Sequence, residues 1–123
     1  MYNYLALGDS TTVGVGAPPG MGYVDILNYY LQNSYPLVYT KKIAQKGWKS
    51  GDLLSALSKN PHSQYYLSTA NLITLYIGGN DLSFAFVRAR LAKNAGPLYE
   101  AVRRFSIQFN EILRMIRTYS KAP

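Results

Sequence analysis

The sequence predicts an α/β fold in which helices cover both faces of a parallel sheet. Three apolar runs have the character of strands, and each is followed by a turn containing glycine and then by a segment with helical spacing. Strands that alternate with helices indicate a parallel sheet covered on both faces. The strand segments are Tyr2–Leu7, Leu37–Ala44 and Asn71–Ile77. Three strands make a small sheet with an open apolar flank, so we expect an incomplete sheet that continues in a longer domain.

The first half of the chain contains two of these strands and one clear helix. Tyr2–Leu7 is an almost continuously apolar run, which is typical of a buried strand. Residues 8–22 are predicted to form a loop, because they are rich in glycine and contain two consecutive prolines. Tyr23–Leu31 is predicted to be a helix with Val24, Leu27 and Leu31 on one face. Leu37–Ala44 is then the second strand.

The second half is predicted to add three helices and the third strand. Ser50 is the expected N-cap of a helix that residues 60–63 interrupt. Leu82–Asn94 is the next expected helix. Gly96 and Pro97 begin the last helix, since proline is favoured at the first helical position. The apolar stripe of this helix consists of Leu98, Val102, Phe105, Phe109, Ile112, Leu113 and Ile116.

Composition excludes several functions. The chain carries a formal charge of +7, but its basic residues are scattered, so we expect no nucleic-acid partner. It has no cysteine, which excludes disulfides and thiolate metal sites. No apolar stretch reaches the roughly 18 residues of a membrane span, so we expect no stable membrane insertion. No signal peptide precedes the first strand, which predicts a cytoplasmic protein, or a secreted one if a leader has been removed.

Three loops at the carboxyl ends of the strands could carry chemistry, because ligands of open parallel sheets bind at that edge. Ser10 follows the first strand and could be a nucleophile, or it could simply cap a turn with Asp9. Asn80 follows the third strand and could donate its amide to an oxyanion, or it could form an Asx-turn. Gly47 in the middle loop offers a further backbone N–H. Together the three loops suit acyl transfer to water.

The chain resembles the GDSL or SGNH hydrolase family at these loops. Residues 5–14 (LALGDSTTVG) are similar to the first family block, with Thr11 where leucine is usual, and residues 77–82 (IGGNDL) are similar to the third. Gly47, followed by residues 50–54, is similar to the second block, with Gly51 as the alternative oxyanion glycine. The resemblance implies that residues 1–123 are the N-terminal portion of a single flavodoxin-like, three-layer α/β/α domain.

The resemblance also implies an activity, a GDSL-type lipase or esterase that acts through an acyl-serine without a cofactor or metal. Ser10 would be the nucleophile and would donate its N–H to the oxyanion, together with Gly47 and Asn80. Asp9 and Asp81 would shape the loops. The substrate would be a small-molecule or lipid ester, whose acyl and alcohol parts the sequence does not specify.

The sequence departs from the family because the block Asp-x-x-His, which carries the base and the acid, is absent. His62 is the only histidine, and it precedes the third strand, where the connection runs at the amino edge of the sheet. We therefore expect an exposed loop histidine and a catalytic base outside these residues. The alternative is a catalytically silent fragment or half-domain that forms a homo-oligomer or associates with a C-terminal fragment.

Two further patterns have open interpretations. Trp48, Phe84, Phe86 and Val87 lie next to the predicted oxyanion donors in sequence, and they could line an acyl pocket or pack in the core. Gly14, Gly16 and Gly20 are weakly similar to a dinucleotide-binding loop, but their spacing differs from G-x-G-x-x-G, and the two prolines obstruct the helix that would have to follow. A phosphate-binding loop of flavodoxin type at Gly8–Gly16 is a further alternative, which would make the chain a nucleotide- or flavin-binding module.

Overall fold

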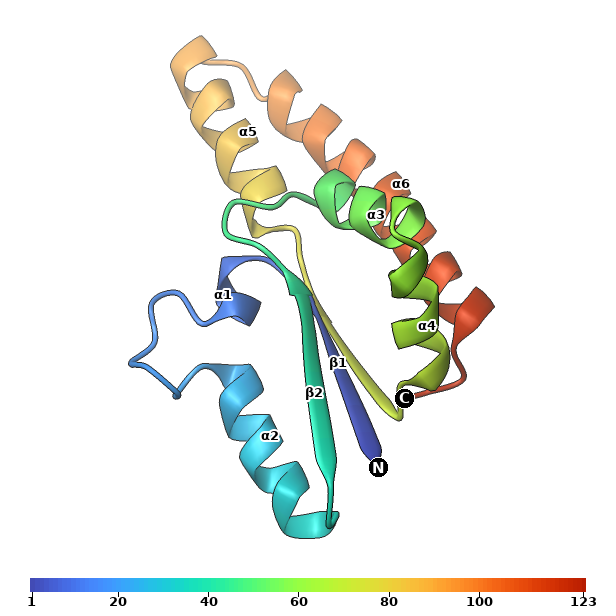
Figure 1. Cartoon of the computed structure of the whole chain (residues 1–123). Coiled ribbons are helices and arrows are strands. Elements are labelled where there is room, and N and C mark those ends of the chain that lie inside the picture. Colours follow the sequence, from blue (N-terminus) through green and yellow to red (C-terminus); the bar gives the residue numbers. More distant parts are fainter.

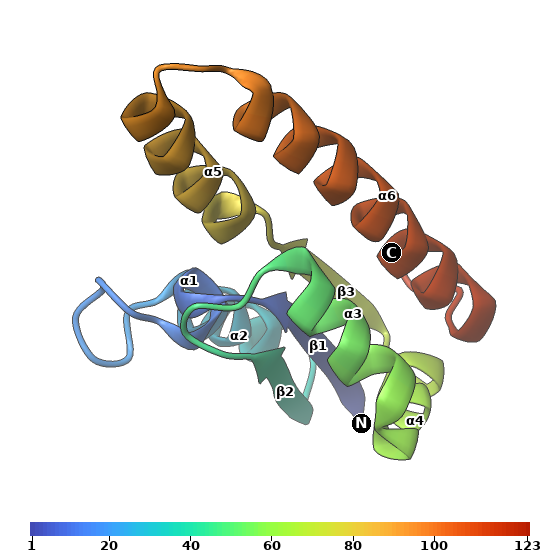
Figure 2. The same cartoon turned by 90° about the horizontal axis from the view of Figure 1, so that it is seen from above.

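The computed structural model describes all residues from Met1 to Pro123 and confirms the predicted α/β class. The parallel sheet has the order β2-β1-β3, formed by β1 (Tyr2–Gly8), β2 (Val38–Ala44) and β3 (Leu72–Tyr76). Figure 1 shows α1 (Ser10–Val13) and α2 (Tyr23–Ser34) on one face of the sheet. The other face is covered by α3 (Ser50–Lys59), α4 (Pro61–Thr69) and α6 (Gly96–Tyr119). Figure 2 shows α5 (Gly79–Ala92) antiparallel to α6.

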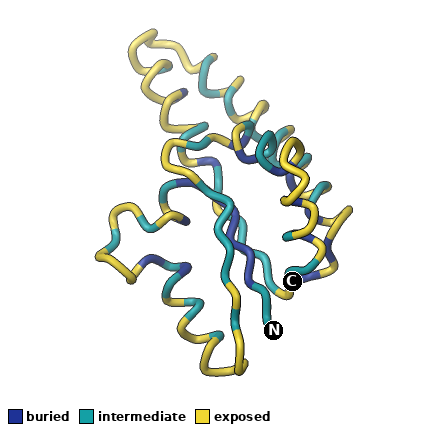
Figure 3. Tube along the Cα trace, viewed as in Figure 1, coloured by how far each residue is buried: buried dark blue, intermediate teal, exposed yellow.

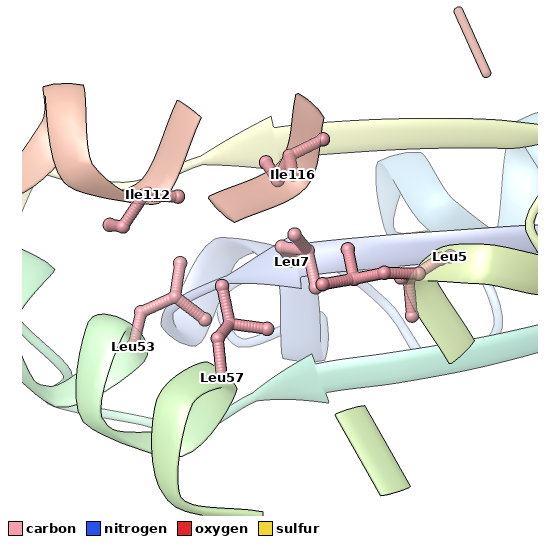
Figure 4. Close-up of a cluster of buried hydrophobic side chains, with 7 residues drawn as sticks. Leu5, Leu7, Leu53, Leu57, Ile112 and Ile116 are labelled. Carbon is pink, nitrogen blue, oxygen red and sulfur yellow. The ribbon is translucent and has the colours of Figure 1, made fainter. Parts of the chain in front are cut away.

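The central strand β1 is buried on both sides, as the dark blue trace in Figure 3 shows. Leu5 and Leu7 point to one face, where the main core cluster forms (Figure 4). The other members of this cluster are Leu53, Leu57, Leu67, Ile112 and Ile116. Tyr4 and Ala6 point to the opposite face and pack against Val24 of α2. The two-residue alternation of a strand therefore explains why an almost wholly apolar segment occupies this position.

The register of the sheet aligns the ends of the three strands. Gly8, the last residue of β1, pairs with Ala44 of β2 and with Tyr76 of β3. All three strands therefore end on one rung, and the loops that follow them begin side by side. This alignment determines which residues can meet at the carboxyl edge of the sheet.

The structure corrects the expected helices at three places. The predicted loop 8–22 contains the short helix α1. Ser50 is the first residue of α3 and not its N-cap, a position that Lys49 takes. The predicted turn after β3 is already helical from Gly79, so α5 begins before the expected Leu82.

The segment expected to interrupt the second long helix instead joins two helices. α3 ends at Lys59, and α4 follows at once. The Asn60 side chain accepts a hydrogen bond from the His62 N–H at 3.0 Å, and Pro61 occupies the first turn, so both residues start the new helix. His62 is exposed as expected, but it lies in a helix and not in a loop.

The last helix uses only part of its predicted apolar stripe. Ile112 and Ile116 are buried in the core, whereas Val102 and Leu113 are exposed. Beyond α6, the chain returns to the outer edge of β3, where the Pro123 carbonyl accepts a hydrogen bond from the Ile73 N–H at 2.9 Å. None of the helices combines the length and the apolar character that crossing a membrane requires.

Candidate active site

The loop after β1 leaves no room for a side chain at Gly8. A Cβ atom there would overlap the Thr12 hydroxyl and would lie 2.5 Å from the Tyr76 carbonyl oxygen. Thr12 is buried in α1, and its hydroxyl forms a 2.6 Å hydrogen bond with the Tyr23 hydroxyl at the start of α2. These contacts hold α1 tightly against the carboxyl end of β1.

Ser10 occupies the first position of α1. Asp9 is buried, and its Oδ1 accepts the Thr11 N–H at 3.0 Å, which makes Asp9 the cap of this helix. Ser10 is half-buried, and neither its hydroxyl nor its N–H forms a hydrogen bond within the chain. The first N–H groups of a helix have no partner inside the helix, so the Ser10 N–H is free to donate to a bound group.

The loop after β2 turns at Gly47. This glycine has a φ of +85°, which residues with a Cβ rarely adopt. The turn is closed by a hydrogen bond from the Trp48 N–H to the Gln45 carbonyl at 3.2 Å. Gly51, the alternative oxyanion glycine, lies in the first turn of α3 beneath α6, where a Cβ would approach Gln108 Nε2 to 2.9 Å. The two glycines therefore occupy different surroundings, and Gly47 is the one in the exposed loop.

The loop after β3 requires glycine at position 78 for two reasons. Gly78 has a φ of +123°, and a Cβ there would lie 2.7 Å from the Phe105 ring. Asn80 follows in the first turn of α5 and is half-buried. Its Nδ2 donates to the Trp48 carbonyl at 2.8 Å, which joins this loop to the loop after β2. A side-chain amide nitrogen carries two hydrogens, so one remains for another acceptor.

A second connection between these loops centres on Ser50. The Asp81 carboxylate accepts the Ser50 N–H at 2.9 Å and the Ser50 hydroxyl at 2.7 Å. Ser50 is fully buried, and Gln108 Oε1 of α6 lies 2.7 Å from the same hydroxyl. Because the hydroxyl has a single hydrogen, it can serve both neighbours only if the Gln108 amide turns and donates through Nε2.

The sequence motifs do not predict this network. They predict only a capping role for Ser50 and no role for Gln108. A polar residue at a core-facing position of α6 was the available signal, since Gln108 precedes the buried Ile112 by one helical turn.

His62 is not part of these loops. It belongs to α4, which packs on the face of the sheet opposite α1 and α2. It borders a groove that includes Lys42, Trp48 and Asn60. No group of three or more His, Asp or Glu residues lies close enough to hold one metal ion.

A comparison with known families covers almost the whole chain. Residues 6–123 match the model of the GDSL-like Lipase/Acylhydrolase family. The chain belongs to this family. The resemblance seen in the sequence blocks is thereby confirmed.

Similar proteins support the same family and fold. The uncharacterized protein YpmR of Bacillus subtilis (strain 168) is 35% identical over 114 residues, which are 91% of this chain and 44% of that protein. The lipase Lip_vut3 from a goat rumen metagenome superposes with a TM-score of 0.86 at 27% identity, over 97% of this chain and 57% of that one. AlinE4, an SGNH-hydrolase family esterase, shares the fold at 23% identity and a TM-score of 0.52, over 84% of this chain and 53% of that one. The chain thus spans about half the length of these relatives.

Proposed function

We propose that this chain supplies the nucleophile and the oxyanion-binding groups of a serine ester hydrolase. The observation that carries the proposal is the shared last rung of the three strands, at Gly8, Ala44 and Tyr76. Ser10, Gly47 and Asn80 follow that rung within two to four residues. A hydroxyl nucleophile and separate N–H donors at one edge suit acyl transfer.

The reaction would begin with attack of Ser10 Oγ on the ester carbonyl carbon. The carbonyl oxygen would take the negative charge and accept hydrogen bonds from the Ser10 N–H, the Gly47 N–H and the free Asn80 Nδ2 hydrogen. The alcohol would leave with a proton, which gives an acyl-serine. Water would then attack the acyl carbon and release the acid.

The proton of Ser10 requires a base that these residues do not contain. His62 is exposed on α4, on the other face of the sheet from α1, so it is poorly placed to act. We propose that a histidine and an aspartate of an Asp-x-x-His block act from outside the 123 residues. The carboxylates of Asp9 and Asp81 already have partners, since Asp9 caps α1 and Asp81 binds Ser50, so neither is proposed as the acid that orients the base.

A second candidate is a catalytically silent half-domain that works only in association with another polypeptide. The observation in its favour is that the Ser10 hydroxyl forms no hydrogen bond within the chain, whereas an activated serine needs an adjacent base. The two candidates differ in the reactivity of this one hydroxyl.

Fluorophosphonate labelling followed by intact-mass measurement separates them. A single adduct that maps to Ser10 and is lost in Ser10→Ala supports the hydrolase. The same spectrum reveals any co-purified polypeptide that supplies the base. A folded chain without adduct, under conditions that label a known serine esterase, means that these residues alone are silent. Labelling of Ser10 that appears only when a polypeptide with the Asp-x-x-His block is added then supports the hydrolase, and no labelling even then supports the silent half-domain.

A further inference from the structure

The position of Ser10 depends on a helix that is too short to be stable by itself. α1 contains only four residues, and so short a helix gains little from its own hydrogen bonds. Thr12 is its only buried residue. Ser10 comes two residues earlier in the same turn, so the contacts that fix Thr12 also fix the Ser10 hydroxyl and N–H.

Thr12 is held from two sides. On one side it lies against Gly8, where there is no space for a Cβ atom. On the other side its hydroxyl forms a 2.6 Å hydrogen bond with the hydroxyl of Tyr23, the first residue of α2. The contact with Gly8 is close packing, whereas a hydrogen bond is directional and restricts the orientation of both partners. The Tyr23 hydroxyl is therefore the group that can set the rotation of α1 against the sheet.

Tyr23 is itself fixed by its surroundings. The start of α2 packs against the end of α1, since a Cβ at Gly22 would lie 3.2 Å from the Gly14 Cα (Figure 1). Val24, the next residue of α2, is buried against the sheet. The centre of the Tyr23 ring also lies 6.2 Å from that of Tyr76, on the last rung of β3. Tyr23 thus connects α1 to the rung from which the loops of the site begin.

The other polar contact between α1 and a neighbouring element is exposed. Lys42 of β2 donates through Nζ to the Val13 carbonyl at 3.1 Å. Water can take the place of either partner there, so the loss of this contact should have little effect. The Thr12 hydroxyl, in contrast, belongs to a buried residue and has Tyr23 as its only hydrogen-bond partner in the chain.

We propose that Tyr23 is a positioning residue of the site. Through Thr12, its hydroxyl fixes α1 so that Ser10 keeps its place beside the loops that carry Gly47 and Asn80. The consequence for chemistry rests on the proposed function. The attachment of α1 can be measured without catalysis, on the chain as it is.

Tyr23→Phe removes only the hydroxyl, and Tyr4→Phe is the matched control. The Tyr4 hydroxyl forms a 2.7 Å hydrogen bond with the Thr74 hydroxyl, so the control loses the same kind of pair between β1 and β3 instead of at α1. Amide hydrogen exchange, followed by NMR, reports on α1 through the Val13 and Gly14 N–H groups, which form its backbone hydrogen bonds. We expect Tyr23→Phe to accelerate exchange at these two amides about fivefold, and Tyr4→Phe to leave it unchanged.

The second measurement is the rate at which a fluorophosphonate labels Ser10, on the chain alone or with the added Asp-x-x-His polypeptide. A displacement of about 1 Å can lower a rate by about 100-fold. We therefore expect Tyr23→Phe to lower the maximal labelling rate at least about fivefold, with an unchanged half-saturating concentration. Thr12→Ser should retain the rate, because it keeps the hydroxyl. Thr12→Val combined with Tyr23→Phe should be about as slow as Tyr23→Phe alone, because both remove the same pair.

Exchange at α1 that is unchanged in Tyr23→Phe, or accelerated equally in Tyr4→Phe, would overturn the inference. An unchanged labelling rate in Tyr23→Phe, or losses that add in the double variant, would also overturn it. If Ser10 is labelled under none of these conditions in the parent chain, the hydrolase is refuted. Exchange at α1 then decides alone whether Tyr23 holds Ser10 in place.

Discussion

Asp81 at the start of α5 binds both the N–H and the hydroxyl of Ser50 at the start of α3. The carboxylate thus connects the first turns of α3 and α5, which follow Gly47 and Asn80 in the chain. Both donors come from a fully buried residue, so the loss of the carboxylate removes their partner at a site where an unpaired donor is costly.

Replacing Asp81 by alanine should therefore destabilise the fold. The Ser50 hydroxyl can still donate to Gln108 Oε1, but the buried Ser50 N–H loses its partner. We therefore expect the free energy of unfolding, measured by urea denaturation, to fall by about 1–3 kcal/mol. Asp52→Ala is the matched control, because the exposed Asp52 accepts only the Lys49 N–H at 2.8 Å. It should cost about 1 kcal/mol, as the loss of a helix cap usually does. Equal effects of the two variants would contradict the central role of Asp81.

Replacement by alanine should destabilise the fold at Gly78 but not at the adjacent Gly79. Gly78→Ala adds a Cβ against Phe105 at a φ of +123°, and we expect a loss of about 2 kcal/mol or more in thermal or urea unfolding. Gly79→Ala meets no atom within 4 Å and lies at the first position of α5, so it should be neutral or slightly stabilising. A tolerated Gly78→Ala would mean that the loop before Asn80 can adopt another conformation.

Replacing Asn80 should lower the rate of hydrolysis more than the affinity for the substrate. In a form of the protein that hydrolyses esters, Asn80→Ala should lower kcat by about 10²- to 10³-fold, because one oxyanion donor is lost. His62→Ala should leave kcat unchanged, since His62 is exposed on α4. A large effect of His62→Ala would assign it the role of the base and refute the proposal that the base lies elsewhere.

Stability should decrease at alkaline pH through Tyr4. Burial raises the pKa of the Tyr4 hydroxyl, partly opposed by its hydrogen bond to the Thr74 hydroxyl, and burial together with Tyr35 raises the pKa of Tyr2. A raised folded-state pKa contributes stability that is complete below the unfolded value of about 10 and is lost as the pH rises above it. Urea unfolding at pH 8 and above 10 should show this loss.

Tyr4→Phe should reduce that alkaline decrease and leave only the contribution of Tyr2. Tyr39→Phe, at a 48% exposed position on β2, is the control and should keep it. If both variants lose stability with pH as the parent chain does, then a group other than Tyr4 must be responsible.

The strands and long helices were predictable because their signals are local. Tyr2–Leu7 and Asn71–Ile77 are apolar runs, and proline marks the start of α6. The short helices α1 and α4 were missed because four and nine residues carry little periodicity, and their formation depends on caps at Asp9 and Asn60. The Ser50–Asp81 pair joins residues 31 apart, and the exposure of Phe84 depends on what packs against α5, so neither could be deduced from sequence spacing.

Because all three strands end on the rung at Gly8, the strand register determines where the loops that follow them begin relative to one another. A residue deleted within β1 would withdraw Ser10 by about 3.3 Å relative to the other two loops and would turn Leu5 and Leu7 to the opposite face. Insertions in residues 15–22, which come after Ser10, would leave these positions intact. Length variation among related chains should therefore be tolerated in the segments downstream of the donors, whereas the short stretches between rung and donor should keep a constant length.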